Sequence, residues 1–263
     1  MSATFLEMIT AKTRERVARV KSDHYLAALR KKAAERRAER LPNAFRQALS
    51  REDRISIIAE IKRASPSKGV INANIDPADQ AKRYVNGGAA AISVLTEPDH
   101  FMGSLGDLVN VRKAVDTPIL RKDFIVDEHQ ILEGAAAGAD AILLIVAALS
   151  ASELTALHRV ADECGLDALV EIHTADELKA AADAGAKIIG VNNRDLHSLK
   201  VSLDVSRELI SHKPGGVHMV AESGLSTRDE IDELKGLGFD GFLIGETLMR
   251  SPDILASLSG GAA

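Results

Sequence analysis

Residues 57–69 read Ile-Ile-Ala-Glu-Ile-Lys-Arg-Ala-Ser-Pro-Ser-Lys-Gly and pass from an apolar strand into a polar loop. The β-branched residues at its start are typical of strands. Glu60 and Lys62 are two apart, so on a strand they point to the same side. We expect them to form a pair in a central strand, because an apolar run precedes them; the alternative is a solvated strand edge. The hydroxyls and the cation of the 65–69 loop suit an anionic ligand.

The composition is that of a globular protein large enough for one domain. The chain has 263 residues, of which 46% are apolar and 27% are charged. We expect residues 1–263 to form one domain, with residues 1–50 as a helical extension. Aromatic residues make up 3% and Trp is absent, which argues against base stacking and hence against a nucleic-acid partner. The single cysteine, Cys164, falls in a helical pattern and excludes an internal disulfide framework, which fits a reducing cytoplasm.

The sequence also argues against membrane and metal binding. Charges interrupt the N-terminus early, unlike in a signal peptide, and the longest apolar run, 141–149, is too short to span a bilayer. The eight histidines are scattered and form no His-x-His or His-Glu-x-x-His cluster. We therefore expect no metal, no membrane partner and a cytoplasmic location.

From residue 55 onward, a short apolar run followed by an amphipathic helical pattern repeats eight times. The runs are 55–62, 90–96, 118–124, 141–147, 168–172, 187–192, 217–222 and 241–245. Helical patterns follow them, beginning near 77, 104, 128, 152, 175, 204, 228 and 252. Continuous apolar strands alternating with helices indicate a parallel sheet covered by helices. Eight units favour an α/β fold of the (β/α)8 (TIM) barrel type; a doubly wound sheet is the alternative, but no Gly-x-Gly-x-x-Gly follows an early strand.

The segment before the first strand is expected to hold two helices, at 4–22 and 24–39, ended by Leu41-Pro42-Asn43. Residues 1–50 contain twelve Lys or Arg and five Asp or Glu, a balance of +7 that leaves −12 for the remainder. The basic run from Arg30 to Arg40 is either a solvated helix face or a positive flap over an anionic substrate. The segment has three possible places: on nucleic acid, in the closed end of the barrel, or over the mouth, the place that the family resemblance described below implies.

Polar residues stand at the carboxyl ends of the runs, where barrel enzymes carry their chemistry. The candidates are Glu60, Lys62, Lys122, Phe124, Glu171, Asn192, Arg194, Glu222, Ser223, Gly245 and Glu246. Two lysines and three carboxylates directed at one mouth would shift one another's pKa values and support general acid–base chemistry. The alternative is an ion-pair network that only braces the barrel. We expect His173 to be a bystander that faces a loop.

A phosphate site is indicated at the last two strand ends. Gly224 and Gly245 allow backbone N–H groups to approach an anion. A helix start with capping residues follows at 226–230. Barrel phosphate sites are often built from these two loops, and Ser65 would approach from the first strand across barrel closure.

Six motifs carry a resemblance to a known family. They are Glu-Ile-Lys-Arg-Ala-Ser-Pro-Ser-Lys-Gly at 60–69, Leu-Arg-Lys-Asp-Phe-Ile at 120–125, Val-Glu-Ile-His-Thr at 170–174, Ile-Gly-Val-Asn-Asn-Arg-Asp-Leu at 189–196, Glu-Ser-Gly-Leu at 222–225 and Phe-Leu-Ile-Gly-Glu-Thr-Leu-Met at 242–249. Together they resemble the indole-3-glycerol-phosphate synthase family of tryptophan biosynthesis, from about residue 4 to residue 256. The first motif is long and specific, whereas the glycine motifs alone would fit many phosphate-binding barrels.

The resemblance implies a carboxy-lyase that needs no organic cofactor or metal. Its substrate would be 1-(o-carboxyphenylamino)-1-deoxyribulose 5-phosphate, which closes a ring and loses CO2 and water to give indole-3-glycerol phosphate. By motif position, Lys122 resembles the general acid and Glu171 its acid–base partner. Lys62 resembles a cation for the substrate carboxylate or for dehydration, and the division between the two lysines stays open.

The remaining roles are also implied by the resemblance. Glu60, Asn192 and Glu222 resemble supporting hydrogen-bonding residues, and Ser223 falls at a substrate-contact position. The phosphate-site positions are Ser65, Gly224, Gly245 and Glu246, the last through its backbone N–H.

Two other functions compete with this interpretation. One is phosphoribosylanthranilate isomerase, another phosphate-binding barrel, whose chemistry wants a Cys and an Asp at strand ends; Cys164 is in a helix instead. The other is a non-catalytic ligand-binding barrel, against which the intact set of polar strand ends argues.

Overall fold

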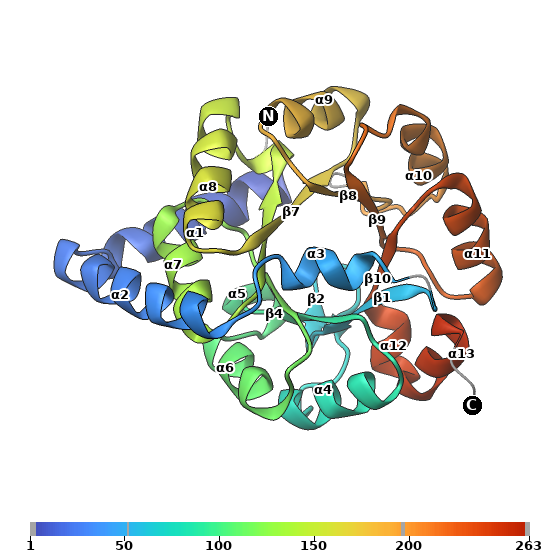
Figure 1. Cartoon of the computed structure of the whole chain (residues 1–263), viewed down its shortest axis with the longest axis horizontal. Coiled ribbons are helices and arrows are strands. Elements are labelled where there is room, and N and C mark those ends of the chain that lie inside the picture. The colour runs from blue at the N-terminus through green and yellow to red at the C-terminus, as the bar shows by residue number, and fades with distance from the viewer. Residues whose placement is uncertain (1–3, 52, 196–197, 261–263) are drawn as a thin grey trace.

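Eight parallel strands close into a barrel in the computed structural model, which describes residues 4–51, 53–195 and 198–260 (Figure 1). Each strand pairs with the next barrel strand along the chain, and the last pairs with the first. The strands are β1 (Ser56–Ile61), β4 (Ala91–Leu95), β5 (Ile119–Lys122), β6 (Ala141–Ile145), β7 (Asp167–Ile172), β8 (Ile188–Asn192), β9 (His218–Glu222) and β10 (Gly241–Ile244). The predicted (β/α)8 barrel is confirmed.

Helices between the strands surround the barrel. They are α4 (Pro77–Asn86), α5 (Pro98–Phe101), α6 (Leu105–Ala114), α7 (Glu128–Ala137), α8 (Ala151–Glu163), α9 (Ala175–Asp183), α10 (Asp204–Leu209), α11 (Arg228–Leu237), α12 (Glu246–Arg250) and α13 (Leu255–Ser259). Side chains such as Asp76, Ser104 and Thr174 accept a backbone N–H at the first turn, which fixes where α4, α6 and α9 begin. Three 3₁₀ turns, η1 (Val146–Ala148), η2 (Ile210–His212) and η3 (Pro252–Ile254), and a small hairpin, β2 (Ala64–Ser65) with β3 (Gly69–Val70), complete this part.

Two of the predicted strands are too long. The run 118–124 forms a strand only to Lys122, and the run 141–147 ends at Ile145, where η1 turns the chain. Both errors lie at the mouth, where the apolar pattern continues past the last residue of the strand.

The strand side chains alternate between two apolar clusters. On β1, Ile57, Ala59 and Ile61 pack outward against the helices, while Ile58 packs in the barrel interior. Glu60 follows Ile58 on the inward face and is 3% exposed. Because both faces of every strand are covered, the strands read as apolar runs rather than as alternating patterns.

A helix that was not predicted, α3 (Ala44–Leu49), closes one end of the barrel (Figure 1). Phe45 and Leu49 are buried and belong to the interior cluster. The Arg46 N–H donates to Asp167 Oδ2 at 2.9 Å, and Ser56 Oγ donates to Ala48 O at 3.0 Å. The six-residue helix shows too little periodicity to be recognised after the predicted break at 41–43. It fills the end at which the strands begin.

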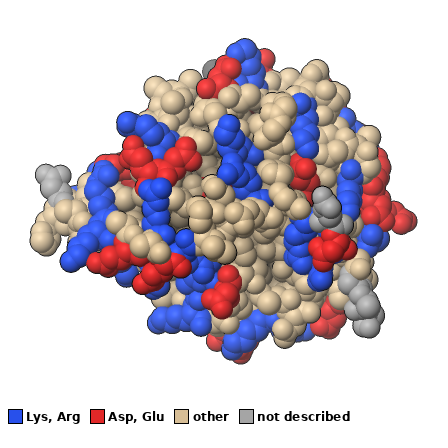
Figure 2. Space-filling model, viewed as in Figure 1, with Lys and Arg blue, Asp and Glu red and all other residues tan. Residues whose placement is uncertain are grey.

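The two predicted N-terminal helices are present as α1 (Phe5–Val20) and α2 (Asp23–Glu39). Helix α2 packs along α7, and α1 reaches the opposite, open end of the barrel. Figure 2 shows Lys and Arg interleaved with Asp and Glu on the side where α2 lies. The basic residues pair with carboxylates of the barrel: Arg14 with Glu153 (2.9 Å), Lys21 with Asp127 (3.0 Å), Arg30 with Glu128 (2.7 Å) and Arg40 with Asp140 (2.8 Å).

These pairs correct the predicted flap. Helix α1 lies at the mouth, but among the described residues of this segment only Phe5 and Leu6 line the cavity, and Arg16 approaches its wall only at Asp123, at 3.9 Å. The +7 segment is instead fastened to the acidic barrel by ion pairs at the helix surface, and the closing of the other end belongs to α3.

Candidate active site

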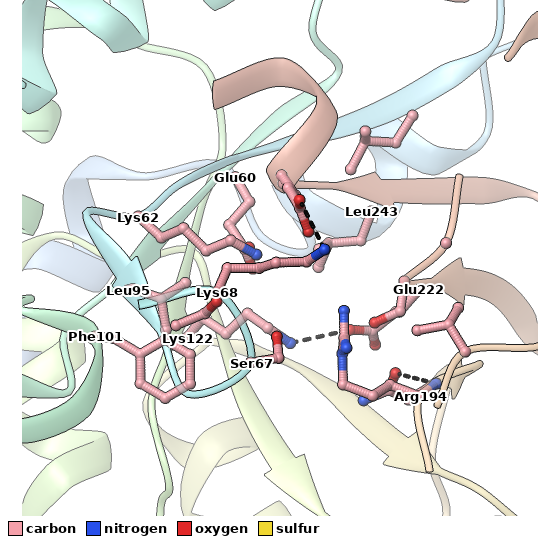
Figure 3. Close-up of a pocket in the computed structure, with 18 of the residues that line it drawn as sticks. Glu60, Lys62, Ser67, Lys68, Leu95, Phe101, Lys122, Arg194, Glu222 and Leu243 are labelled. Carbon is pink, nitrogen blue, oxygen red and sulfur yellow. Dashed lines mark hydrogen bonds and ion pairs between the residues drawn. The ribbon is translucent and has the colours of Figure 1, made fainter. Parts of the chain in front are cut away.

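A cavity of about 910 Å³ opens at the carboxyl ends of the strands. All thirteen predicted site residues line it, namely Glu60, Lys62, Ser65, Lys122, Phe124, Glu171, Asn192, Arg194, Glu222, Ser223, Gly224, Gly245 and Glu246. Figure 3 shows Lys62 and Lys122, from different strands, pointing into the same space. The sequence therefore identified the polar wall of the cavity.

Lys122 is held between two carboxylates. Its Nζ lies 2.9 Å from Glu222 Oε2 and 3.3 Å from Glu171 Oε2 (Figure 3). The Lys122 side chain is 16% exposed, whereas those of Glu171 and Glu222 are 4% and 2% exposed. Burial lowers the pKa of Lys122, but the fields of Glu222, Glu171 and Glu60 outweigh it and raise the pKa overall.

The two carboxylates around Lys122 differ in pKa. Burial raises the pKa of Glu222 to about 7; Lys122 opposes this shift, and Glu171 adds to it. For Glu171, burial also raises the pKa, but Lys122, His173 and the amide of Asn192 together bring it below its usual range. The Asn192 Nδ2 donates to Glu171 Oε1 at 3.1 Å. Paired acids with separated pKa values are suited to acid–base roles.

Glu60 and Lys62 form the predicted inward pair. Lys62 Nζ lies 2.6 Å from Glu60 Oε1, and their side chains are 16% and 3% exposed, respectively. The solvated-edge alternative is therefore wrong. A buried pair of this kind needs close geometry to offset desolvation, and the 2.6 Å separation provides it.

Two glycines make room for these buried acids. A methyl group at Gly190 would overlap Glu222 Oε1, and one at Gly245 would overlap Glu60 Oε1. Gly190 was not predicted, because a glycine inside an apolar run gives no sign of the Glu222 side chain on the neighbouring strand. Glycine is required at position 224 for a different reason, since its φ is +82° and a Cβ would meet Val201 at 2.5 Å.

The end of the cavity predicted to hold phosphate combines the β2–β3 hairpin with the loops after β9 and β10. Lys68 Nζ lies 3.6 Å from Glu246 Oε1, and Arg250 Nε lies 3.3 Å from the same oxygen. The Glu246 carboxylate is thus bound by two cations. Ser65 is 9% exposed and lines the same cavity.

Apart from Phe124, the apolar wall was missed by the sequence analysis. Phe5 of α1 and Phe101 of α5 both contact Phe124, with ring centroids 6.4 and 6.1 Å apart. Leu95, Leu143, Ile145 and Leu243 add aliphatic surface. The chain has six Phe, and three of them meet here. Because aromatic residues are scarce in this chain, these Phe could have been recognised from the sequence as candidates for the site. The aliphatic residues gave none, because every strand is apolar throughout.

His173 faces the loop after β8, as predicted, but its imidazole also lies next to Glu171. Its side chain is 13% exposed, and its Nε2 lies 3.7 Å from Glu171 Oε1. Burial lowers its pKa, but Glu177 and Glu171 raise it by more. The preceding strand places Glu171 inward, and the turn after β7 folds the imidazole back onto that carboxylate.

The described residues show neither a metal-binding cluster nor a membrane-spanning helix. Among residues 4–51, 53–195 and 198–260, no group of three or more His, Cys, Asp or Glu side chains is placed to hold a metal ion. None of the helices in that part of the chain combines the length and the apolar character needed to cross a bilayer. Cys164 follows α8 and is half-buried; burial raises the pKa of its thiol.

Fold and site together define a (β/α)8-barrel protein whose open end carries an acid–base cluster of buried lysines and glutamates. The family model for indole-3-glycerol phosphate synthase matches residues 6–259. The chain belongs to the indole-3-glycerol phosphate synthase family.

Individual relatives agree with this assignment. The chain is 47% identical over 253 residues to an indole-3-glycerol phosphate synthase of Carboxydothermus hydrogenoformans, covering 95% of this chain and 96% of that one. It is also 47% identical over 260 residues to one of Koribacter versatilis, covering 98% of each. Among solved structures, thiamine phosphate pyrophosphorylase from Pyrococcus furiosus has a TM-score of 0.58 at 16% identity, covering 78% of this chain and 93% of that one. That likeness concerns the fold alone.

Proposed function

We propose that this protein converts 1-(o-carboxyphenylamino)-1-deoxyribulose 5-phosphate into indole-3-glycerol phosphate, CO2 and water. The observation that carries the proposal is the position of Lys122 between Glu171 and Glu222 in a cavity with both an apolar and a polar end. We also infer a cytoplasmic protein in which residues 1–263 form one domain.

The first step needs an acid at the ketone oxygen. The ring carbon that bears the carboxylate attacks the ketone carbon, and the developing oxyanion takes a proton. Lys122 supplies this proton in our proposal, because its ammonium projects into the cavity and two neighbouring carboxylates can return a proton to it. A positioned general acid contributes about 10²–10⁴-fold.

CO2 then leaves and its bonding electrons restore the aromatic ring. In the dehydration, the hydroxyl takes a second proton and departs as water, while the adjacent carbon loses a proton to a base. Glu171 is the proposed base, since its pKa is held low, and Asn192 orients it through the 3.1 Å hydrogen bond. Glu222, with a pKa of about 7, stabilises the charge of Lys122 from the other side.

Lys62 is proposed to engage the substrate carboxylate or to assist dehydration. Glu60 holds its ammonium at 2.6 Å, so the cation is positioned before substrate arrives. The Arg194 guanidinium donates to Leu199 O at 3.1 Å, which fixes it beside the cavity as a further cation for the substrate. Phe124 supplies part of the apolar surface for the aromatic ring of the substrate.

The phosphate is proposed to lie at the end of the cavity formed by the β2–β3 hairpin and the loops after β9 and β10. Ser65, Ser223, Gly224 and Gly245 would donate hydroxyl or backbone hydrogen bonds, and residue 246 would donate its backbone N–H. The Glu246 side chain faces Lys68 and Arg250, so its charge is offset there. Binding energy at the phosphate would hold the reacting carbons together at a distance from it.

The proposed reaction consumes one proton in each turnover. Two protons are delivered to oxygen and one is removed from carbon, which matches the loss of a carboxylate charge as neutral CO2. The cavity must therefore take up one proton from solvent before the next cycle.

The test is to add this substrate to the purified protein and follow indole fluorescence together with released CO2. We expect one CO2 for each indole formed. The isomerase alternative predicts turnover of phosphoribosylanthranilate without indole, and a ligand-binding barrel predicts binding without product. Cys164 does not line the cavity, which argues against the isomerase.

A further inference from the structure

The imidazole of His173 stands directly behind Glu171, outside the cavity that would receive substrate. Glu171 has one oxygen on each side: Oε2 lies 3.3 Å from Lys122 Nζ, and Oε1 lies 3.7 Å from His173 Nε2. The carboxylate thus separates the proposed acid from the histidine. This arrangement gives Glu171 two proton partners rather than one.

His173 is held in place by the first turn of α9. Its Nδ1 lies 3.4 Å from Glu177 Oε2, and the same oxygen accepts the His173 backbone N–H at 2.6 Å. Within the described part of the chain, neither ring nitrogen has a partner in hydrogen-bonding geometry. Both nitrogens sit at distances that a small shift or one bridging water would close.

A second cavity, of about 140 Å³, adjoins the imidazole. Its lining includes Asp195, Lys200 and Ser202 of the loop after β8, which are exposed, so the space adjoins solvent at that loop. Asn192 lines both this space and the large cavity. His173 lines the small cavity and not the large one, so water could reach its imidazole beside the substrate space.

The charges around His173 favour its protonated form. Glu171 of β7, Glu177 of α9 and Glu222 of β9 all raise its pKa against the effect of burial. Lys122 lies beyond Glu171, and Asp195 and Lys200 face the small cavity from the loop after β8. Three carboxylates on three elements thus support the imidazolium.

We propose that His173, held by Glu177, is a positioning residue that acts through Glu171 and returns to it the proton taken from solvent in each turnover. The N–H bond at Nε2 breaks as an O–H bond forms on Glu171, which passes a proton to the Lys122 amine. The imidazole then regains a proton from water in the small cavity. One proton enters for each CO2 released, and resupply continues while product occupies the mouth. This inference rests on the proposed function.

The test uses His173→Asn, which keeps a polar side chain but cannot relay a proton. The matched control is His158→Asn, because His158 is also buried and also has a carboxylate at i+4, with its Nδ1 3.5 Å from Asp162 Oδ2, yet it lies on α8 away from both cavities. We expect kcat of His173→Asn to fall at least ~10-fold with KM within about twofold, while the control is unchanged.

Two readouts separate a relay from a packing role. Added imidazole at constant pH and ionic strength should raise kcat of His173→Asn to a plateau, and it should not affect wild type or His158→Asn. The acidic limb of the pH profile should move to higher pH, because His173 helps to keep the pKa of Glu171 low. Should His173→Asn not fold, Glu177→Gln is measured instead; it should show a smaller loss in kcat that imidazole does not relieve, because the His173 ring still occupies its site, and unchanged kcat would overturn the proposal.

Unchanged kcat in His173→Asn would overturn the proposal. So would a loss that imidazole does not relieve and that leaves the pH limb in place. Failure of wild type to make indole is a different result, which would contradict the proposed function itself.

Discussion

A buried carboxylate at each end of this barrel, Asp140 at the closed end and Glu222 at the mouth, is held in a different way. At the end closed by α3, both oxygens of Asp140 are bound, Oδ1 by Arg40 Nε at 2.9 Å and Oδ2 by the Ile119 N–H at 2.8 Å. At the mouth, Glu222 Oε2 holds Lys122, whereas Oε1 is buried without a hydrogen-bond partner among the described residues. One backbone amide and two guanidinium groups, those of Arg40 and Arg112, bind the first carboxylate, whereas the second keeps an oxygen available.

The neighbours of these carboxylates differ as well. Phe45 and Leu49 fill the closed end, and Figure 2 shows a largely uncharged surface where α3 crosses it. The mouth instead surrounds a cavity of about 910 Å³. Side chains at the closed end pack for stability. At the mouth, some buried polar atoms lack a hydrogen-bond partner that a bound substrate would supply. Substitutions at the two ends should therefore separate stability from activity.

The largest effect is expected from Phe45→Ala at the closed end. Phe45 is 0% exposed, and its removal would leave a cavity in the interior cluster. We expect the free energy of unfolding to fall by about 3–5 kcal/mol, with kcat of the folded fraction close to wild type. Urea unfolding and steady-state kinetics measure the two quantities. A clear fall in kcat of the folded protein would mean that the closed end also affects activity, so that the two ends are not separable.

Gly190→Ala tests the mouth with a single methyl group. This methyl would overlap Glu222 Oε1 and push the carboxylate toward Lys122. We expect kcat to fall at least ~10-fold and stability to fall by about 1–3 kcal/mol, the usual range for overpacking. Gly236→Ala is the matched control, since Gly236 lies in α11 with no atom within 4 Å of an added Cβ. Equal activity in both variants would rule out the tight fit at Glu222.

The pH dependence of stability should differ between wild type and Glu222→Gln. The folded-state pKa of Glu222 is about 7, above the reference value of 4.5. Between these values the folded protein keeps a proton that the unfolded chain has lost, so stability decreases as pH rises, by up to about 1.4 kcal/mol per pH unit. Glu222→Gln should lack this decrease between pH 4.5 and 7. Parallel stability curves for the two proteins would show that the Glu222 pKa is not raised.

The smallest effect is expected from Arg14→Gln in the N-terminal segment. Arg14 pairs with Glu153 at 2.9 Å, but the two side chains are 46% and 39% exposed. Solvent screening limits such a pair to less than ~1 kcal/mol of stability. KM should stay unchanged, because the charge faces the barrel surface and not the cavity. If KM is instead raised at low salt and the difference from wild type disappears at high salt, the N-terminal segment does steer the anionic substrate toward the mouth.

The sequence predicted the polar part of the site better than its shape. Glu60 and Lys62 were placed on one inward face by strand periodicity, and the 2.6 Å pair confirms it. Lys122 and Glu171 were placed at one mouth by fold topology. These inferences succeed because a charged side chain on an otherwise buried barrel strand must face the polar cavity at the open end.

The rest could not be predicted for physical reasons. Helix α3 has six residues, too few for a periodic signal, and its role depends on Phe45 meeting strands distant in sequence. Leu143 and Ile145 line the cavity but look like any other core residue. The contacts of His173 were not predicted, because its partner Glu177 comes from the next helix and its distance from Glu171 depends on the turn after β7.

The most direct measurement of the central claim is the turnover of Lys122→Met, followed by indole fluorescence with the proposed substrate. Methionine keeps most of the bulk but cannot donate a proton. Lys122→Arg serves as the companion variant, because it keeps a cation between Glu171 and Glu222 and so limits any loss of folding. We expect kcat to fall at least ~10²-fold in both folded variants, with a much smaller change in substrate affinity. Near-normal turnover in folded Lys122→Met would contradict the account.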